Sequence, residues 1–277
     1  VGRTPDRVTV PLVRVLDWPD LAERGGWGGN MGTDLEWMSS VKMNLAEVHA
    51  TLGFTADGTA TASFRSEVLD QARRHAFRIV PIIHHIDQFA PIGLFTKHPE
   101  THGVGPTARL QGHDYCEVPC SSNPAFQAIM TQWMTDLARI QGVDTVCVWL
   151  SENDLQCGCD ACKAVGEFVA ETRLCLKAWE AARQVNPTLA LRLLLTQGSY
   201  KANDKVLAEI PPGVQVSYYD GGRTYDSSRE PMIYPLLENY AKGGRWLGVY
   251  PQITASWRVV CPWSGPQFVR ARLTEFV

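Results

Sequence analysis

The residues best suited to catalysis follow an apolar run at 146–150, where the sequence continues Ser-Glu-Asn-Asp. The run has the composition of a buried strand, and loops that leave the carboxyl ends of parallel strands converge on one open face. Glu152 is therefore suited to general acid/base catalysis, and Asp154 to orienting it or binding a hydroxyl. The structural alternatives are a capping or ion-pairing role for Glu152 and an Asx turn at Asp154.

A further carboxylate, Asp220, ends a second apolar run at 214–219 and is the best candidate partner for Glu152. Tyr218 and Tyr219 precede it and two glycines follow, so a simple turn residue is the alternative interpretation. Aromatic rings at strand ends can stack on the apolar face of a sugar. The two tyrosines, Trp27 and Trp257 are candidates for that contact.

Histidines end two more strand-like runs. Because adjacent strand residues point to opposite faces, at most one of His84 and His85 faces the site, and we assign His85 to it. His49 shares a face with Glu47 and is suited to binding hydroxyls, although a satisfied structural histidine is the alternative in each case. A cluster of His49, His85 and Asp87 would instead support a metal-dependent hydrolase or lyase.

The cysteines form a constellation around the same position. Cys116 and Cys120 precede a helix predicted to start at residue 123, and Cys157, Cys159 and Cys162 follow the run that precedes Glu152. Both segments are expected on the carboxyl face of the sheet. Cys120 with the last three suits a tetrahedral structural zinc, whereas one or two disulfides of an exported protein are the alternative. Either the zinc site or the disulfides would fix the loop that carries Glu152.

Strand-like and helix-like runs alternate along the chain, which is typical of a parallel sheet built from βαβ units. The expected strands are 8–16, 43–49, 77–86, 143–150, 189–196, 214–219 and 246–250. We expect residues 1–277 to form one (β/α)8 barrel of the TIM type, incomplete at its C-terminal end if the chain is a fragment. Propensity favours a loop at 23–30, and the alternative is a glycine-rich strand, in which case the run at 8–16 lies outside the barrel. We expect the long connection at 87–122 to cover the site, with packing against a neighbouring helix or subunit as the alternative.

The composition of the chain limits the classes of partner that we expect it to bind. The net charge is −3, and no basic block alternates with aromatic residues, so nucleic acid and anionic membranes are not expected partners. No apolar stretch approaches the roughly 20 residues that span a bilayer. The eight cysteines are ambiguous about the compartment, and we expect a secreted or periplasmic bacterial protein rather than a cytoplasmic one.

Three segments resemble glycoside hydrolase family 20, the β-N-acetylhexosaminidases. Arg24 and Gly25 match the opening of the family's first strand, the Lys-Met-Asn at 42–44 and His49 match its second strand, and 71–87 is similar to its third. The Cys-rich segment at 148–164, together with the upstream segment at 116–126, resembles poorly characterised bacterial relatives of that family more closely. The resemblance implies a (β/α)8 barrel that hydrolyses glycosides. The family's Asp-Glu pair is replaced by Ser151-Glu152, which departs from substrate-assisted catalysis.

Together these observations predict a glycoside hydrolase acting on an N-acetylhexosamine-containing or related glycan, without a cofactor for catalysis. The predicted catalytic residues are Glu152, Asp154 and Asp220; the predicted substrate-binding residues are Arg24, Trp27, Asn30, His49, His85, Tyr218, Tyr219 and Trp257; and the predicted metal ligands are Cys120, Cys157, Cys159 and Cys162. The alternatives are a non-catalytic carbohydrate-binding barrel and a metal-dependent hydrolase or lyase of the same fold. The oligomeric state is not determined by the sequence.

Overall fold

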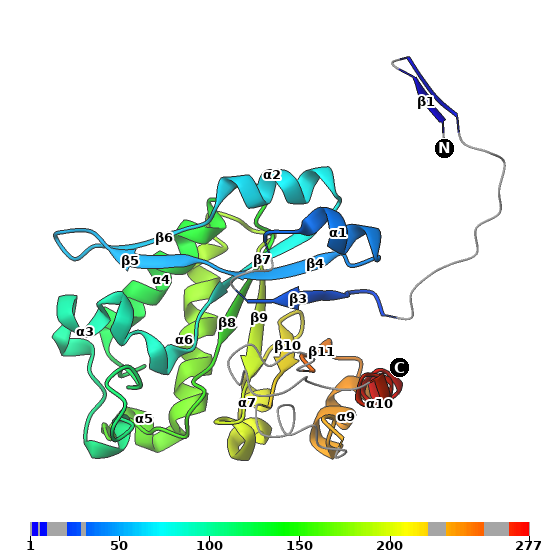
Figure 1. Ribbon diagram of the computed structural model, residues 1–277. Helices are drawn as coiled ribbons and strands as arrows, with labels where there is room; N and C mark the ends of the chain where they lie inside the picture. The colour runs from blue at the N-terminus through cyan, green and yellow to red at the C-terminus, as the bar shows by residue number, and fades with distance from the viewer. Residues whose placement is uncertain are drawn as a thin grey trace.

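The computed structural model describes residues 2–4, 6–9, 21–28, 32–220, 231–251 and 266–276. Its main feature is a sheet of seven strands in the order β11-β10-β9-β8-β7-β4-β3 (Figure 1). The strands are β3 (Gly25–Trp27), β4 (Leu45–His49), β7 (Arg78–Ile83), β8 (Thr145–Trp149), β9 (Ala190–Leu195), β10 (Gln215–Tyr218) and β11 (Leu247–Val249). Every neighbouring pair is parallel. The predicted fold is confirmed as an incomplete (β/α) barrel.

Helices connect the consecutive strands of this sheet, and one more helix follows the last strand (Figure 1). They are α1 (Leu35–Ser40), α2 (Ser66–Arg74), α4 (Pro124–Ala138), α5 (Asp160–Val165), α6 (Glu167–Ala182), α7 (Asn203–Glu209), α9 (Pro235–Lys242) and α10 (Pro266–Phe276). The start of α4 shows why the sequence signal was reliable. The Asn123 side chain accepts hydrogen bonds from the N–H groups of Ala125 and Phe126, and Pro124 occupies the first turn, where no N–H is needed.

Strand alternation divides the core into two layers. On β8, Val146 and Val148 face the helices and join the large apolar cluster formed with α2, α4 and α6. Cys147 and Trp149 face the opposite side and join a smaller cluster inside the barrel. The inner layer ends in polar and aromatic side chains at the carboxyl ends of the strands, which is where a barrel of this kind places its site.

The first strand of the sheet follows the alternative interpretation of residues 23–30 and not the loop that propensity favours. Gly25–Trp27 pairs with β4, whereas Arg7–Thr9 (β2) pairs with Gly2–Thr4 (β1) in a separate antiparallel sheet. Propensity favoured a loop because glycine is a weak strand former. Glycine is required at position 25 because β4 passes so close that a Cβ there would lie 1.9 Å from the Leu45 carbonyl oxygen. Residues 10–16 of the strand expected at 8–16 lie outside the described residues.

The long connection after β7 is folded and not an open loop. It contains η1 (Ile86–Gln88), η2 (Ala90–Ile92), α3 (Leu94–Lys97), η3 (Pro99–Thr101) and η4 (Pro106–Ala108). Another short 3-10 turn, η5 (Tyr200–Ala202), lies in a later connection, directly before α7. α3 contacts the β5 (Thr51–Phe54) and β6 (Ala60–Ser63) hairpin, and η3 contacts α4. This packing corresponds to the alternative interpretation of the segment. None of the described helices has the length and apolar character needed to cross a bilayer.

Candidate active site

Aromatic rings from across the sheet meet on the inner face, near the carboxyl ends of the strands. The ring centroid of Trp27 lies 5.1 Å from that of Trp149 and 5.9 Å from that of Tyr219, and it stacks on Tyr250 at 6.2 Å. We call these four residues the aromatic floor. The sequence predicted Trp27 and Tyr219 as site residues, and the structure brings them together. Trp149 and Tyr250 were not predicted, because each continues an apolar run and looks like a core residue.

Glu152 lies beside the aromatic floor and is partly exposed. Its Oε2 accepts a hydrogen bond of 3.0 Å from the Gln88 side-chain amide, and its Oε1 lies 3.5 Å from the Tyr219 hydroxyl, which donates to it. The two donors follow β7 and β10, on either side of the strand that leads to Glu152. The carboxyl group is therefore oriented by neighbouring elements and remains accessible to a ligand.

Asp87 holds the backbone of the loop that carries Glu152. It is fully buried, and its carboxylate accepts hydrogen bonds of 3.1 Å from the N–H groups of both Glu152 and Asn153. The Asn153 amide adds a third at 2.7 Å. Burial raises the pKa of Asp87, while the nearby His85 and these donors act in the opposite direction. With both oxygens occupied, Asp87 supports the site and does not present a free carboxylate.

Two half-buried histidines, His49 and His84, lie against Trp149. Their ring centroids are 4.9 Å apart, and that of His49 is 5.1 Å from Trp149. Burial, and secondly the neighbouring His85, lowers the pKa of His49 to about 4 and that of His84 to about 2. Both rings are neutral near pH 7, so each offers one N–H donor and one acceptor nitrogen.

From the sequence we assign His85 to the site and not the adjacent His84, and the structure corrects this assignment. His84, not His85, continues the inward alternation of Val80 and Ile82 on β7. His85 is only 5% exposed, and its Nδ1 lies 2.8 Å from the Leu150 carbonyl oxygen. A carbonyl can only accept, so Nδ1 carries the hydrogen and His85 ties the β7 end to the β8 end.

Asp154 and Tyr218 do not contribute to the site in the way the sequence suggested, and Asp220 is engaged by Tyr218. Asp154 is exposed and pairs at 3.6 Å with Lys201, which is more exposed still. Tyr218 is fully buried on the helix-facing side of β10, and its hydroxyl donates to Asp220 at 2.8 Å. Tyr218 therefore belongs to the core and not to the predicted sugar site.

Another predicted ligand-binding residue, Arg24, lies away from the site. Arg24 precedes β3, at the amino end of the sheet, where its Nε donates to the Lys42 carbonyl at 2.8 Å and its backbone N–H to Asn44 at 2.9 Å. A groove of about 510 Å³ opens at that end, and in barrels that face contributes to stability and not to catalysis. Asn30 and Trp257 lie outside the described residues.

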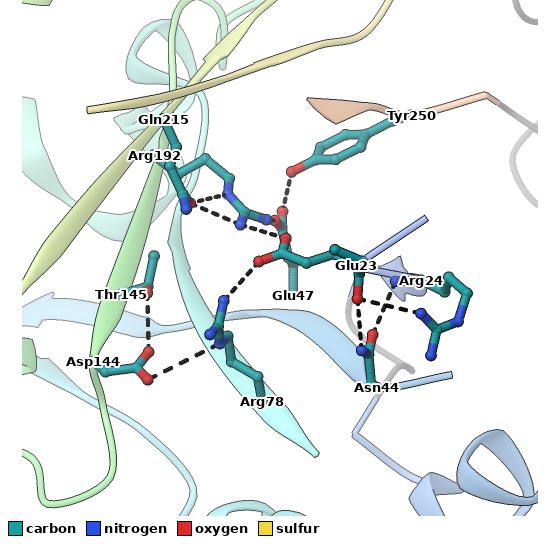
Figure 2. Close-up of polar contacts among 11 residues, drawn as sticks. Glu23, Arg24, Asn44, Glu47, Arg78, Asp144, Thr145, Arg192, Gln215 and Tyr250 are labelled. Carbon is teal, nitrogen blue, oxygen red and sulfur yellow. Dashed lines mark hydrogen bonds and ion pairs between the residues drawn. The ribbon is translucent and has the colours of Figure 1, made fainter. Parts of the chain in front are cut away.

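A buried charge network crosses the inside of the barrel, and sequence reasoning missed its centre (Figure 2). Arg192 on β9 donates to Glu47 on β4, although β8 and β7 lie between these strands. It also donates to Gln215 at 2.8 Å and to Glu23 at 2.7 Å. The Tyr250 hydroxyl donates to the other oxygen of Glu47. The available signal was the lone arginine within the apolar strand Ala190–Leu195, since a buried charge requires a partner.

The predicted metal ligands do come together. The sulfur atoms of Cys120, Cys157, Cys159 and Cys162 all lie within 4.8 Å of one another. Cys116 is separate from this group, and its sulfur accepts from the Asn153 amide at 3.6 Å. In the described part of the chain, these four cysteines are the one group of His, Cys, Asp or Glu side chains arranged to hold a metal ion. His49, His85 and Asp87, the cluster that would support a metal-dependent hydrolase or lyase, are not arranged to hold a metal ion.

Comparison with known proteins shows the fold. No family model matches the sequence, and no curated protein matches it. A family 20 β-N-acetylglucosaminidase has a similar structure, with a TM-score of 0.54 and 14% identity over 84% of this chain and 53% of that one. The structure of a β-N-acetylhexosaminidase is similar with a TM-score of 0.52 and 10% identity, over 94% of this chain and 76% of that one. The structure of a β-galactosidase from Rahnella sp. R3 is similar with a TM-score of 0.52 and 13% identity, over 91% of this chain and 48% of that one.

The chain thus spans about half the length of the first and third of these enzymes. The similar structures include enzymes named for different sugars, so they do not indicate a substrate. The likeness, at this identity, is one of fold. The chain has a (β/α) barrel fold similar to that of these enzymes, incomplete in the residues that the structure describes.

Proposed function

We propose that this protein hydrolyses a glycosidic bond in an N-acetylhexosamine-containing or related glycan, with Glu152 as the general acid/base. The observation that carries the proposal is the position of Glu152. Its carboxyl group is accessible, oriented by Gln88 and Tyr219, and placed beside the aromatic floor. Protonation of the leaving oxygen requires a carboxyl group in such a position.

The surrounding residues have roles that follow from their chemistry. The aromatic floor offers ring faces and edges to the apolar side of a sugar. The neutral imidazoles of His49 and His84 can bind hydroxyl groups without introducing charge. Asp87 keeps the Glu152 backbone in place through its hydrogen bonds.

The reaction needs a second group besides the acid. Asp87 has both oxygens engaged, Asp154 is exposed and pairs with Lys201, and the buried Asp220 accepts from the Tyr218 hydroxyl, so we assign the attacking group to none of them. An N-acetylhexosamine carries its own nucleophile, the acetamido oxygen, and so needs no protein nucleophile, although Ser151 supplies no carboxylate to orient that group. On this basis we expect aryl 2-acetamido-2-deoxyglycosides to be cleaved faster than the matching 2-hydroxyl glycosides.

The test compares Glu152→Gln with Asp154→Asn on a panel of aryl glycosides. Glutamine keeps the shape of Glu152 and its contacts but cannot deliver a proton, so we expect kcat to fall by about 10²-fold or more. Asp154→Asn is the matched control, since it removes an exposed carboxylate from the same loop, and its kcat should stay within a factor of about 2 of wild type. Equal turnover in Glu152→Gln and wild type would refute the assignment.

One observation favours a second candidate, a barrel that binds carbohydrate without cleaving it. Ser151 stands where the resembled family has an aspartate, and it is fully buried, with its hydroxyl donating to Glu171 on α6. This turns the position away from the inside of the barrel. Titration calorimetry with the same sugars distinguishes the two functions: binding that is equal in wild type and Glu152→Gln, without turnover in either, supports the binding barrel.

A further inference from the structure

The four cysteines that meet beside the catalytic loop have the geometry of a closed metal site. We infer that Cys120, Cys157, Cys159 and Cys162 bind one Zn²⁺ as a tetrahedral, structural centre. A zinc ion with four thiolates at about 2.3 Å has sulfur-to-sulfur edges of about 3.8 Å. The Cys120 and Cys159 sulfur atoms are 3.6 Å apart, and no pair in the group exceeds 4.8 Å. The inference does not depend on the proposed hydrolysis.

The arrangement favours a metal over disulfides. Two disulfides need two close pairs, with no reason for all four sulfur atoms to converge on one point. Here they converge, and polar groups surround them: the N–H of Val104 donates to Cys157 at 3.4 Å, and the N–H of Cys162 donates to Cys159 at 3.4 Å. The Ser122 hydroxyl lies 3.3 Å from the Cys162 sulfur. Hydrogen bonds of this kind stabilise thiolates that coordinate a metal.

Zinc fits better than other thiolate-bound ions for a structural role. Three of the four cysteines are buried, and four protein ligands leave no open position for water or substrate. Zn²⁺ has no redox chemistry and accepts tetrahedral sulfur coordination, so it can hold the loops without reacting. The centre therefore does not activate the water that would hydrolyse a glycan.

The centre joins the two loops that build the candidate site. Cys120 belongs to the connection after β7, which also supplies Asp87 and Gln88, whereas Cys157 follows Glu152 on the connection after β8. Backbone contacts reinforce the junction. The N–H of Gly158 donates to the Val104 carbonyl at 2.6 Å, and a Cβ on Gly158 would lie 2.6 Å from that same oxygen, so only glycine allows this approach.

The decisive measurement is the metal content of the folded protein, purified without chelators and with any affinity tag removed. We expect one zinc ion per chain by plasma mass spectrometry. Cys159→Ser should lose zinc on dialysis against a chelator that wild type resists, because it removes one ligand and alters the least buried of the four positions. Cys116→Ser is the matched control: this thiol is buried nearby but lies outside the group, so zinc should be retained.

Two further measurements keep the inference testable if Cys159→Ser does not fold. Wild type reloaded with Co²⁺ should show the thiolate-to-cobalt absorption of a tetrahedral sulfur site, and the mass of unfolded, unreduced wild type should show every thiol intact. Folded wild type without zinc, iron at the same stoichiometry, or a mass reduced by disulfide formation would each overturn the inference. Loss of zinc in Cys116→Ser but not in Cys159→Ser would overturn it as well. None of these readouts depends on turnover, so they fail or succeed separately from the proposed hydrolysis.

Discussion

At the scale of single residues, burial decides the charge state of the groups around Glu152. His49 and His84 lie against Trp149, and their burial lowers the pKa of both imidazoles well below the usual value for histidine. A neutral pair of rings beside a carboxyl group is suited to an uncharged, hydroxyl-rich ligand. Two cationic imidazoles would instead favour an anionic ligand.

The lowered pKa of His49 predicts a pH dependence of stability. The pKa of His49 is about 4 in the folded protein and about 6.5 when unfolded. Between these values the unfolded chain binds the extra proton, so this residue makes the free energy of unfolding fall as the pH drops from about 6.5 to about 4. His49→Gln should reduce that fall, as measured by urea unfolding at pH 7, 6, 5 and 4. Parallel curves for wild type and variant would show that His49 does not cause the dependence.

The residues whose position the sequence predicted are those fixed by strand order. Glu152 comes two residues after the strand predicted at 143–150, and Tyr219 is the last residue of the strand predicted at 214–219, so their place at the carboxyl end of the sheet followed from the order of the elements. Asp154 could not be placed in the same way. Its direction depends on a turn and on Lys201, which follows the next strand, and neither appears in the local pattern.

At the scale of elements, hydrophobic alternation predicted six of the strands of the main sheet, because β4 and β7–β11 are apolar and of ordinary strand composition. It missed β3, where Gly25 is required by the close approach of β4 and is not favoured by strand propensity. The partners of Arg192 also could not be predicted from the sequence. Its contact with Glu47 passes over β8 and β7, so it exists only once the sheet has curled.

The buried Arg192 predicts a large effect of its removal. Arg192 is 1% exposed and Glu47 is 1% exposed, so Arg192→Met leaves a buried carboxyl group without its cation. Burial raises the pKa of Glu47 even with Arg192 and Tyr250 present, which shows how strongly this carboxyl group depends on its partners. We expect a loss of about 3–5 kcal/mol in the free energy of unfolding, measured with urea.

Arg78→Met is the control for this prediction. Arg78 pairs with Glu23 at 2.6 Å, but its side chain is 45% exposed, so the loss should be at most about 1 kcal/mol. Adding Glu47→Gln to Arg192→Met should recover part of the loss, since it removes the unpaired charge. Equal losses for Arg192→Met and Arg78→Met would contradict the view that burial sets the magnitude.

At the scale of the whole molecule, side chains inside the barrel join the two ends of the strand order. β3 and β11 are the outer strands of the described sheet, yet Trp27 on β3 stacks on Tyr250, which directly follows β11. The Tyr250 hydroxyl also reaches Glu47 on β4, next to β3. These contacts hold the sheet in its curved shape, and the stacked Trp27 and Tyr250 are part of the aromatic floor beside Glu152. The curvature and the candidate site therefore share residues.

Tyr250→Phe tests this link between curvature and site. The substitution keeps the ring that stacks on Trp27 and removes only the hydroxyl that donates to Glu47, so one oxygen of a buried carboxyl group loses its donor. We expect the free energy of unfolding to fall by about 1–3 kcal/mol, as measured by urea unfolding, whereas Tyr115→Phe at a half-exposed position should change it by less than about 0.5 kcal/mol. Because the hydroxyl links the end of β11 to Glu47 on β4, the amide hydrogens of β11 and β3 should also exchange faster in the variant than in wild type, with less change in β8 and β9. Unchanged exchange at both outer strands would mean that the sheet keeps its curvature without this contact.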